Sequence, residues 1–198
     1  MRSKNKIVLF DLDKTLISCD SLKQLLLFLL RRDFYKFYFK IPFLIKISLL
    51  HFFSGCDHRT KTKSKFFSKI LEGYSKEQIN KFSKEFANLI FLNFKNRKIY
   101  KTLINSKKIG DKVYIVTASA DFYCKFIAKL FKAKLISTKV NLNKKEFGNI
   151  IGKNCFGKEK KKRVLKEIKN FKKKYSILYT DSKTDIPLLK ICKKGYII

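Results

Sequence analysis

The sequence predicts an α/β fold in which a parallel sheet carries helices on both of its faces. Short apolar runs alternate with longer segments of helical periodicity, which is typical of consecutive strand–helix units. The first run, residues 7–10 (IVLF), is apolar at every position, as in a strand buried on both faces. Polar residues follow directly where several of these runs end. The carboxyl ends of parallel strands are where such folds bind ligands, so these polar residues are candidates for a site.

Composition indicates the cellular setting of the 198-residue chain. Its five cysteines are widely spaced and form no Cys-x-x-Cys pair, which favours reduced thiols over disulfides or a zinc site. Only four consecutive apolar residues precede Asp11, too few for a secretory signal, so we expect a cytoplasmic protein. The 47 Lys and Arg against 15 acidic residues give a net charge of +32. Such a field attracts phosphates, nucleic acid or an anionic membrane surface.

Two carboxylates, Asp11 and Asp13, follow the first strand and suggest chemistry. Like charges this close repel, which makes sense if a divalent cation neutralises one while the other can carry a proton. Alternate residues of an extended chain point to opposite sides, so both can reach one centre only if the chain coils tightly after the strand. The alternative is a surface turn in which Asp serves as a local cap.

Residues 20–93 predict an all-helical insert between a core formed by residues 1–19 and 94–198. Asp20 and Ser21 form an N-cap pattern, and residues 22–30 that follow are apolar on almost every side of a helix, which requires burial or lipid. Pro42 should interrupt any helix that reaches it. Further on, residues 75–78 form a capping box that opens an amphipathic helix.

Basic and aromatic residues are mixed throughout the first part of this insert. Residues 22–70 contain eleven Lys or Arg and two acidic residues, and no charge-free run approaches the ~18 residues that a membrane span needs. One interpretation is an interfacial helix on an anionic membrane, at the inner face of the membrane. The other, which we slightly favour, is a cap that packs on its own core with Lys stems covering the rim.

The rest of the chain alternates between predicted helices and strands. We expect helices over about 96–107, 122–130 and 157–174, and strands over 113–116, 135–138, 176–180 and 195–198. The segment 139–157 predicts a loop with three glycines. In the basic segment 157–174, most lysines should form a solvated face, but Lys160 opens the helix.

Carboxylates, a hydroxyl and one lysine at strand ends suit a phosphoryl group held with Mg²⁺. In order and spacing, four segments resemble the motifs of the haloacid-dehalogenase (HAD) superfamily of phosphatases. They are DLDKT (11–15), the strand that ends at Thr117, Lys160 in GKEKKKRVL, and DSKTD (181–185). The contexts VTASADFY, ISTKV and NCFGKEK look like subfamily IB, which includes phosphoserine phosphatase and a bacterial phosphatidylglycerophosphate phosphatase. The resemblance implies a Rossmann-like core with a C1-type helical cap inserted after the first strand.

The resemblance also implies a role for each motif residue. Asp11 would be the nucleophile that forms an aspartyl-phosphate, and Asp13 would protonate the leaving oxygen and later deprotonate water. This division agrees with a general principle, that neighbouring carboxylates in different environments can serve as nucleophile and as acid. The Thr117 hydroxyl and the Ala118 N–H would hold phosphate oxygens, and Lys160 would neutralise their charge. Mg²⁺ would be bound by Asp11, by the carbonyl of Asp13 and by Asp181, with Asp185 in support.

Some positions depart from the family pattern. Thr180 and Lys14 stand where the family usually has Gly. Asp20 falls where phosphoserine phosphatase has a Glu that binds the substrate amine, although it can equally be only a helix cap, which weakens phosphoserine as the substrate. Arg59 is a candidate contact for a substrate anion from the insert.

These features predict a Mg²⁺-dependent phosphomonoester hydrolase. Its substrate would be a lipid phosphate, similar to phosphatidylglycerophosphate, or a small phosphometabolite such as phosphoserine or a sugar phosphate. The alternative from another class is a basic module that binds nucleic acid or a membrane surface on an inactive core. Intact Asp11, Asp13 and Lys160 speak against an inactive core. Arg is scarce, which disfavours specific base readout, so we expect no specific nucleic-acid partner.

Overall fold

The computed structural model describes residues 5–53, 56–143 and 146–198, without the side chains of residues 48 and 51–59. Its five strands form one parallel sheet in the order β3-β2-β1-β4-β5, with β1 at the centre. The strands are β1 (Ile7–Phe10), β2 (Lys112–Ala120), β3 (Lys134–Thr138), β4 (Ser176–Thr180) and β5 (Lys194–Ile197). The predicted α/β fold with a parallel sheet is confirmed.

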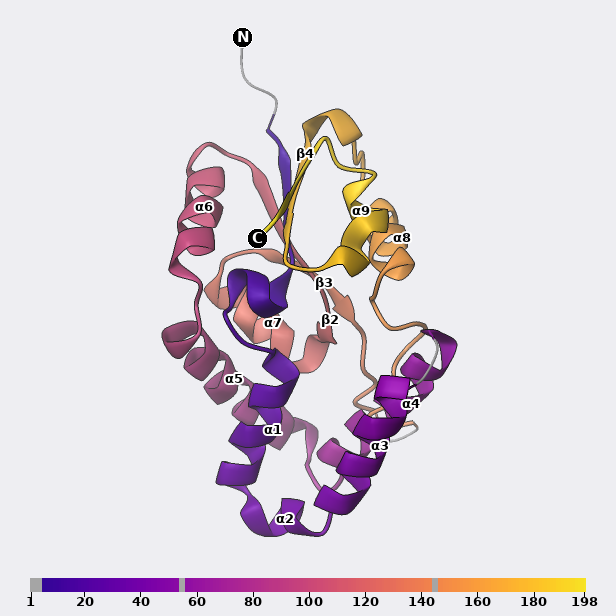
Figure 1. Ribbon diagram of the computed structural model, residues 1–198. Helices are drawn as coiled ribbons and strands as arrows, with labels where there is room; N and C mark the ends of the chain where they lie inside the picture. Colours follow the sequence, from indigo (N-terminus) through magenta and orange to yellow (C-terminus); the bar gives the residue numbers. More distant parts are fainter. Residues whose placement is uncertain (1–4, 54–55, 144–145) are drawn as a thin grey trace.

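Helices surround this sheet and gather at one of its ends. They are α1 (Ser21–Arg32), α2 (Phe34–Tyr38), α3 (Ile41–Phe53), α4 (Cys56–Leu71), α5 (Lys76–Asn93), α6 (Arg97–Lys108), α7 (Asp121–Leu130), α8 (Lys158–Glu167) and α9 (Ile186–Leu189). Helices α1 to α5 lie at the end of the sheet where β1 finishes (Figure 1). None of the helices in the described ranges is long and apolar enough to cross a bilayer.

Both faces of the sheet are buried, as its continuous apolar strands require. Along β1, Val8 and Phe10 belong to one hydrophobic cluster, which includes residues of α6 and α7. Ile7 and Leu9 belong to a second cluster, which includes residues of α8 and α9. The period of two along a strand therefore divides the core into two layers, with helices on each.

The apolar helix α1 is explained by burial within the protein. Leu25 and Leu29 are fully buried, and the Phe28 ring lies 5.6 Å from the ring of Phe86 on α5. The N-cap prediction is confirmed, because the Asp20 carboxylate accepts a hydrogen bond from the Lys23 N–H at 3.0 Å. The capping box at the start of α5 and the helix break before Pro42 are also present.

One face of α4 is bound to the segment that follows β3. Three hydroxyl side chains spaced four residues apart lie on one side of a helix, so they can meet the same neighbour. The hydrogen bonds are Ser68 Oγ to Phe147 O (3.0 Å), Ile150 N to Ser64 Oγ (3.0 Å) and Asn154 N to Thr60 Oγ1 (3.3 Å). The predicted loop over 139–157 thus supports the helical insert directly.

The helix predicted over 157–174 is wrong in its length. Helix α8 ends at Glu167, and Leu165 near its end is half exposed. Asn170 then adopts a left-handed backbone with φ of 61°, a conformation that Asn tolerates better than most residues. The chain has to turn here because Ser176 must pair with Ile7 at the centre of the sheet. Sheet pairing therefore overrides the helical periodicity of the sequence.

Candidate functional site

The turn after β1 has the tight coil that two converging carboxylates require. The Asp11 N–H still donates to the Tyr179 carbonyl on β4 at 2.9 Å. The chain then winds over Leu12–Leu16, where the Ile17 N–H donates back to the Leu12 carbonyl at 3.1 Å. Within the turn, Lys14 has φ of 56°, the left-handed region that glycine adopts most readily. The family's preference for Gly at this position therefore has a conformational reason.

Asp11, Lys160 and Asp185 form a buried ionic cluster. The Lys160 ammonium donates to Asp11 Oδ1 at 2.9 Å and to Asp185 Oδ2 at 2.8 Å. Thr180 at the end of β4 donates its hydroxyl to the same Asp185 oxygen at 2.8 Å. Asp11, Lys160 and Asp185 lie far apart in sequence. They meet because the ends of β1 and β4 and the first turn of α8 lie side by side. Thr180, which replaces a common Gly, takes part by orienting Asp185.

Burial and charge act in opposite directions on this cluster. Burial raises the pKa of Asp11 to about 6, although the nearby ammonium of Lys160 partly offsets this effect. Burial alone would lower the pKa of Lys160, but the carboxylates of Asp11 and Asp185 raise it above its usual value. A permanently charged lysine therefore lies against a carboxylate whose ionisation is costly without a further cation.

Asp13 has a separate set of neighbours. Its two carboxylate oxygens accept from the Ser21 N–H at 2.7 Å and from the Ser119 hydroxyl at 2.7 Å. The Ser21 hydroxyl in turn lies 3.1 Å from Ser119 Oγ and 3.2 Å from the Tyr123 hydroxyl. Burial raises the pKa of Asp13, and the hydrogen bonds from Ser119 and Ser21 oppose this rise. A raised pKa is what a carboxyl group needs to deliver a proton.

The strand predicted over 113–116 is longer in the structure: β2 runs to Ala120, so Thr117 and Ala118 lie inside it, where its register with β3 shifts. Thr117 is buried, and its hydroxyl oxygen accepts from the Ser119 N–H at 3.0 Å. The Ala118 carbonyl accepts from the Lys63 ammonium and from the Thr138 hydroxyl, both at 2.7 Å. These contacts fix the backbone of the 117–119 segment on which a phosphate would rest.

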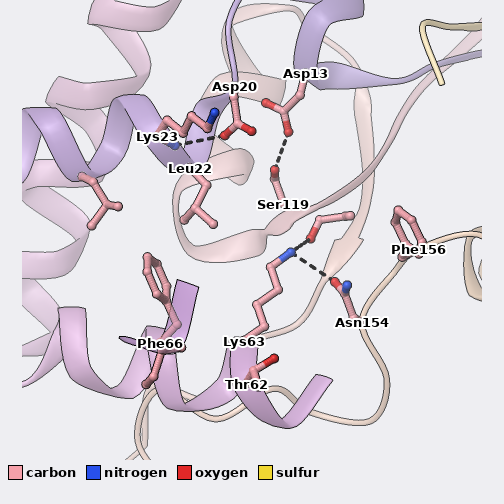
Figure 2. Close-up of a pocket in the computed structure, with 13 residues that line it drawn as sticks. Asp13, Asp20, Leu22, Lys23, Thr62, Lys63, Phe66, Ser119, Asn154 and Phe156 are labelled. Atoms are coloured by element: carbon pink, nitrogen blue, oxygen red, sulfur yellow. Dashed lines mark hydrogen bonds between the residues drawn. The ribbon is translucent and has the colours of Figure 1, made fainter. Parts of the chain in front are cut away.

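A cavity of about 370 Å³ lies between this strand end and the helices α1, α3 and α4 (Figure 2). Its polar lining includes Asp13, Asp20, Lys63, Ser119 and Asn154, and its apolar lining includes Leu22, Leu26, Ile47, Phe66 and Phe156. One wall therefore carries both signs of charge, and the helical insert supplies much of the apolar remainder.

Lys63 reaches into this cavity from α4. Its ammonium donates to the Ala118 carbonyl at 2.7 Å and to the Asn154 side-chain oxygen at 3.2 Å (Figure 2). Burial lowers the pKa of Lys63 to about 8. The Lys63 ammonium is thus held beside the end of β2 by two neutral oxygen acceptors.

Three other predicted site residues have different outcomes. Asp20 lines the cavity and also caps α1, so the two alternatives for it are compatible. Asp181 follows β4 directly and is half-buried. The other predicted acid of this motif, Asp185, is the one that contacts Lys160. The side chain of Arg59 on α4 lies outside the described residues.

A Mg²⁺ ion suits the donors at this end of the sheet. Mg²⁺ prefers oxygen ligands and is commonly bound by one or two carboxylates together with waters and phosphate oxygens. Asp185 Oδ1 is buried without a hydrogen-bond partner among the described atoms, and the Asp11 carboxylate has the raised pKa of a desolvated acid. Within the described ranges, no group of three or more Asp, Glu, His or Cys side chains is arranged to hold a metal ion. Water and phosphate would have to complete the coordination.

Several residues of the site were not among those predicted from the sequence. Ser119 could have been found, because it follows Thr117 at the same strand end. Lys63 and Asn154 could not, because Lys63 is one of several alternating lysines at the start of α4 and only the tertiary fold distinguishes it. Ser21 was identified only as part of a helix cap.

Comparisons with known proteins agree with this arrangement. Residues 8–190 match the family described as haloacid dehalogenase-like hydrolase. A search of curated protein sequences found no match.

Among solved structures, a protein of unknown function from Bordetella pertussis Tohama I is similar with a TM-score of 0.81 and 23% identity, over 98% of this chain and 89% of that one. A phosphoserine phosphohydrolase-like protein from Francisella tularensis subsp. tularensis SCHU S4 has a TM-score of 0.60 and 19% identity, over 96% and 85%. A phosphoserine phosphatase with a phospho-aspartyl intermediate analogue has a TM-score of 0.64 and 16% identity, over 98% and 86%. At these identities the likeness concerns the fold.

Proposed function

Because the chain belongs to the haloacid dehalogenase-like hydrolase family, we propose that it is a Mg²⁺-dependent phosphomonoesterase that works through an aspartyl-phosphate. The observation that supports this most is the buried contact of Lys160 with Asp11 and Asp185, at 2.9 and 2.8 Å. A lysine held against a potential nucleophile is positioned to neutralise the charge of an incoming phosphoryl group.

In the first step, a carboxylate oxygen of Asp11 attacks phosphorus and the bond from phosphorus to the ester oxygen breaks. Asp13, whose pKa burial raises, donates its proton to that oxygen, so the product leaves as a neutral alcohol. Lys160 stays charged throughout because Asp11 and Asp185 raise its pKa. The Thr117 hydroxyl and the Ala118 N–H hold the other phosphate oxygens.

In the second step, the Asp13 carboxylate takes a proton from water, and the hydroxide oxygen attacks phosphorus. The bond between phosphorus and Asp11 breaks, which releases inorganic phosphate and restores both carboxyl groups. Ser119 and Ser21 keep Asp13 in one orientation through their hydrogen bonds of 2.7 Å. The same carboxyl group can therefore act as acid and then as base.

Asp11, the Asp13 carbonyl and Asp181 would hold the magnesium ion, with Asp185 in support. When bound, the ion supplies positive charge that keeps Asp11 ionised and offsets the charge of the phosphoryl oxygens.

The cavity supports two substrate classes. Leu22, Leu26, Ile47 and Phe66 from the helical insert form an apolar wall that would accommodate the acyl part of a lipid phosphate such as a phosphatidylglycerophosphate. Asp20 and Lys63 in the same cavity could instead pair with the ammonium and carboxylate of a phosphorylated amino acid such as phosphoserine. Sugar phosphates are a further small-molecule candidate.

Phosphate release from purified protein tests the proposal. Activity should require Mg²⁺ and should fall by at least about 10²-fold in Asp11→Asn and Lys160→Ala, the usual scale for loss of a transition-state contact. Lys161→Ala is the matched control, since Lys161 lies on the same helix outside the cluster. Unchanged release in Asp11→Asn or in excess chelator would exclude the mechanism. Lipid, amino-acid and sugar monophosphates assayed side by side would distinguish the substrate classes.

A basic binding module on an inactive core is the alternative. It predicts no phosphate release from any of these substrates. Because the proposed nucleophile, acid and lysine are all present and clustered, we favour the enzyme.

A further inference from the structure

Exposed apolar side chains are concentrated at one end of the helical insert. Eight of the seventeen large apolar side chains exposed in the described part of the chain lie between residues 34 and 50. We call them the α2–α3 patch: Phe34, Tyr35, Tyr38, Phe39, Phe43, Ile45, Leu49 and Leu50. Tyr35 is 89% exposed and Phe39 is 85% exposed. Isolated exposed apolar residues are ordinary, but a contiguous group marks an interaction surface.

The aromatic residues between 34 and 39 form a continuous part of the patch, away from the sheet (Figure 1). Its aromatic rings contact one another, with centroids 5.9 Å apart for Phe34 and Tyr38 and 5.3 Å apart for Tyr38 and Phe39. Helix α2 forms the tip of the molecule that is farthest from the N-terminal end of β1 (Figure 1). A surface at this tip can meet a large partner without obstruction by the core.

Helix α3 has apolar residues on its outer side as well as its inner side. Leu44 and Ile47 are buried against the core, whereas Ile45 and Leu49 are more than half exposed. A helix packed on a soluble core normally presents polar residues outward. An outward apolar face on α3 therefore indicates a second apolar environment.

Charge identifies the partner. Residues 31–50 contain five basic residues and one acidic residue, Asp33, which is already bonded to the Tyr74 hydroxyl at 2.7 Å. Four of the basic residues are exposed, Arg31, Arg32, Lys36 and Lys46, and of these Arg32 is paired with Glu85. Aromatic and aliphatic side chains edged by cations are typical of surfaces that enter the boundary between lipid headgroups and acyl chains. A second copy of the chain fits poorly, because each copy carries a net charge of +32 and would repel the other.

We propose that the α2–α3 patch docks on an anionic lipid bilayer. The aromatic rings and Ile45 enter the headgroup boundary, while the exposed cations contact anionic headgroups. Ile47 lines the active-site cavity and also a neighbouring groove of about 540 Å³, which Phe43 and Leu50 of the patch line as well. The patch and the site cavity thus border a shared groove, whose lining also includes Lys46, Lys65 and Lys69. The docking itself does not depend on the proposed phosphatase activity.

Vesicle sedimentation of the full chain tests the inference. The probes are phosphatidylcholine vesicles with and without phosphatidylglycerol, at low and physiological salt. The test variant is Tyr35→Ser with Phe39→Ser, and the matched control is Leu92→Ser with Ile109→Ser, two residues that are 76% and 69% exposed outside the patch. We expect wild type and control to bind anionic vesicles and the test variant to bind at least about tenfold more weakly, because it loses two large apolar side chains that the headgroup boundary would bury.

Any other result for binding or for oligomeric state overturns the inference. Wild type that stays in the supernatant does not dock, and equal binding of all three proteins means that general positive charge is responsible. A dimer that only Tyr35→Ser with Phe39→Ser converts to a monomer would assign the patch to a second copy. Hydrolysis of a soluble phosphoester by the same proteins is measured in parallel. If none hydrolyses it while the binding pattern holds, the proposed function fails and the docking surface stands.

Discussion

Asp11 illustrates at the residue scale how a functional group can lower the stability of its own fold. Its pKa of about 6 in the folded protein exceeds the 3.8 expected when unfolded, because burial opposes ionisation. Below pH 3.8 the carboxyl group is protonated in both the folded and the unfolded state, so its ionisation does not change the free energy of unfolding. As the pH rises through about 6, the folded state must ionise a buried carboxyl group, so stability is lost.

Asp11→Asn should therefore raise the free energy of unfolding at pH 7 in the absence of divalent cations. The expected gain is about 3 kcal/mol, since the pKa rises from 3.8 to about 6 and one pKa unit corresponds to about 1.4 kcal/mol, while Lys160 keeps Asp185 as a partner. The gain should shrink towards zero as the pH falls to about 4, where the native carboxyl group is also neutral. Urea denaturation with chelator at both pH values measures it. Equal stability at pH 7 would contradict the expected cost of ionisation.

Lys63 should make substrate affinity depend on pH in the alkaline range. Its pKa of about 8 means that the ammonium is mostly charged at pH 7 and mostly neutral at pH 9. If it contacts a substrate anion, KM should rise about tenfold between these values, in proportion to the lost charged fraction. Lys63→Met should have a higher KM with this pH dependence removed. The control is Lys65→Met, an exposed neighbour on α4, which should keep the wild-type profile.

At the scale of elements, the contact between α4 and the 147–154 segment depends on Gly148. Its φ is 83°, and a Cβ atom there would lie 2.3 Å from Ser68 Cα, a backbone atom that cannot move alone. Gly148→Ala should lower the free energy of unfolding by about 3 kcal/mol or more, the upper range for overpacking. Denaturant unfolding measures this loss.

Gly152→Ala separates the effect of backbone strain from the effect of the close contact with Ser68. Gly152 has a similar φ of 75°, but a Cβ there meets nothing within 4 Å. Its substitution should cost only the backbone strain, about 1 kcal/mol. Equal losses at both positions would mean that the close approach to Ser68 has no role.

The core strands were predictable because the sequence marks each of them twice, by a short apolar run and by the polar residues that follow it. Strands β1 and β4 are short apolar runs that end in acids, so both their location and their polar ends were visible, and β4 has the predicted bounds. Helix α8 was predicted too long because its periodicity continues past the point at which sheet pairing stops the helix. Local patterns specify what a segment can form, while tertiary pairing decides where it ends.

The candidate site was predictable to the extent that its residues adjoin strand ends. Asp11 follows β1 directly, as this rule expects, whereas Thr117 lies within β2 and Lys160 lies in the first turn of α8. Their roles in a site stay predictions. Lys63 belongs to the helical insert, where no strand end marks a functional position. Its selection from several neighbouring lysines depends on the packing of α4 against the 147–154 segment, which no short pattern encodes. The division into core and cap, and the subfamily, stay predictions.

At the scale of the whole molecule, the net charge of +32 should accelerate the encounter with phosphorylated substrates. We expect kcat/KM to fall about tenfold when NaCl rises from about 0.05 to 0.5 M, because the Debye length shortens, while kcat stays constant. Steady-state kinetics across the salt series measures both constants. Sucrose at matched osmolarity is the control and should leave kcat/KM unchanged. A parallel fall in kcat would indicate that salt acts on the folded state instead.

The central position of β1 also has a consequence for how the chain folds during synthesis. Ile7 pairs with Lys112 on one side and with Ser176 on the other, so the first strand made is the one that must wait longest for its neighbours. Pairings so distant in sequence form slowly, whereas helices such as α5 can form from local contacts as the chain emerges. Until Lys160 and β4 have been synthesised, β1 has an open apolar edge and Asp11 has no lysine beside it. Nascent chains are therefore both inactive and prone to aggregate until β4 is complete.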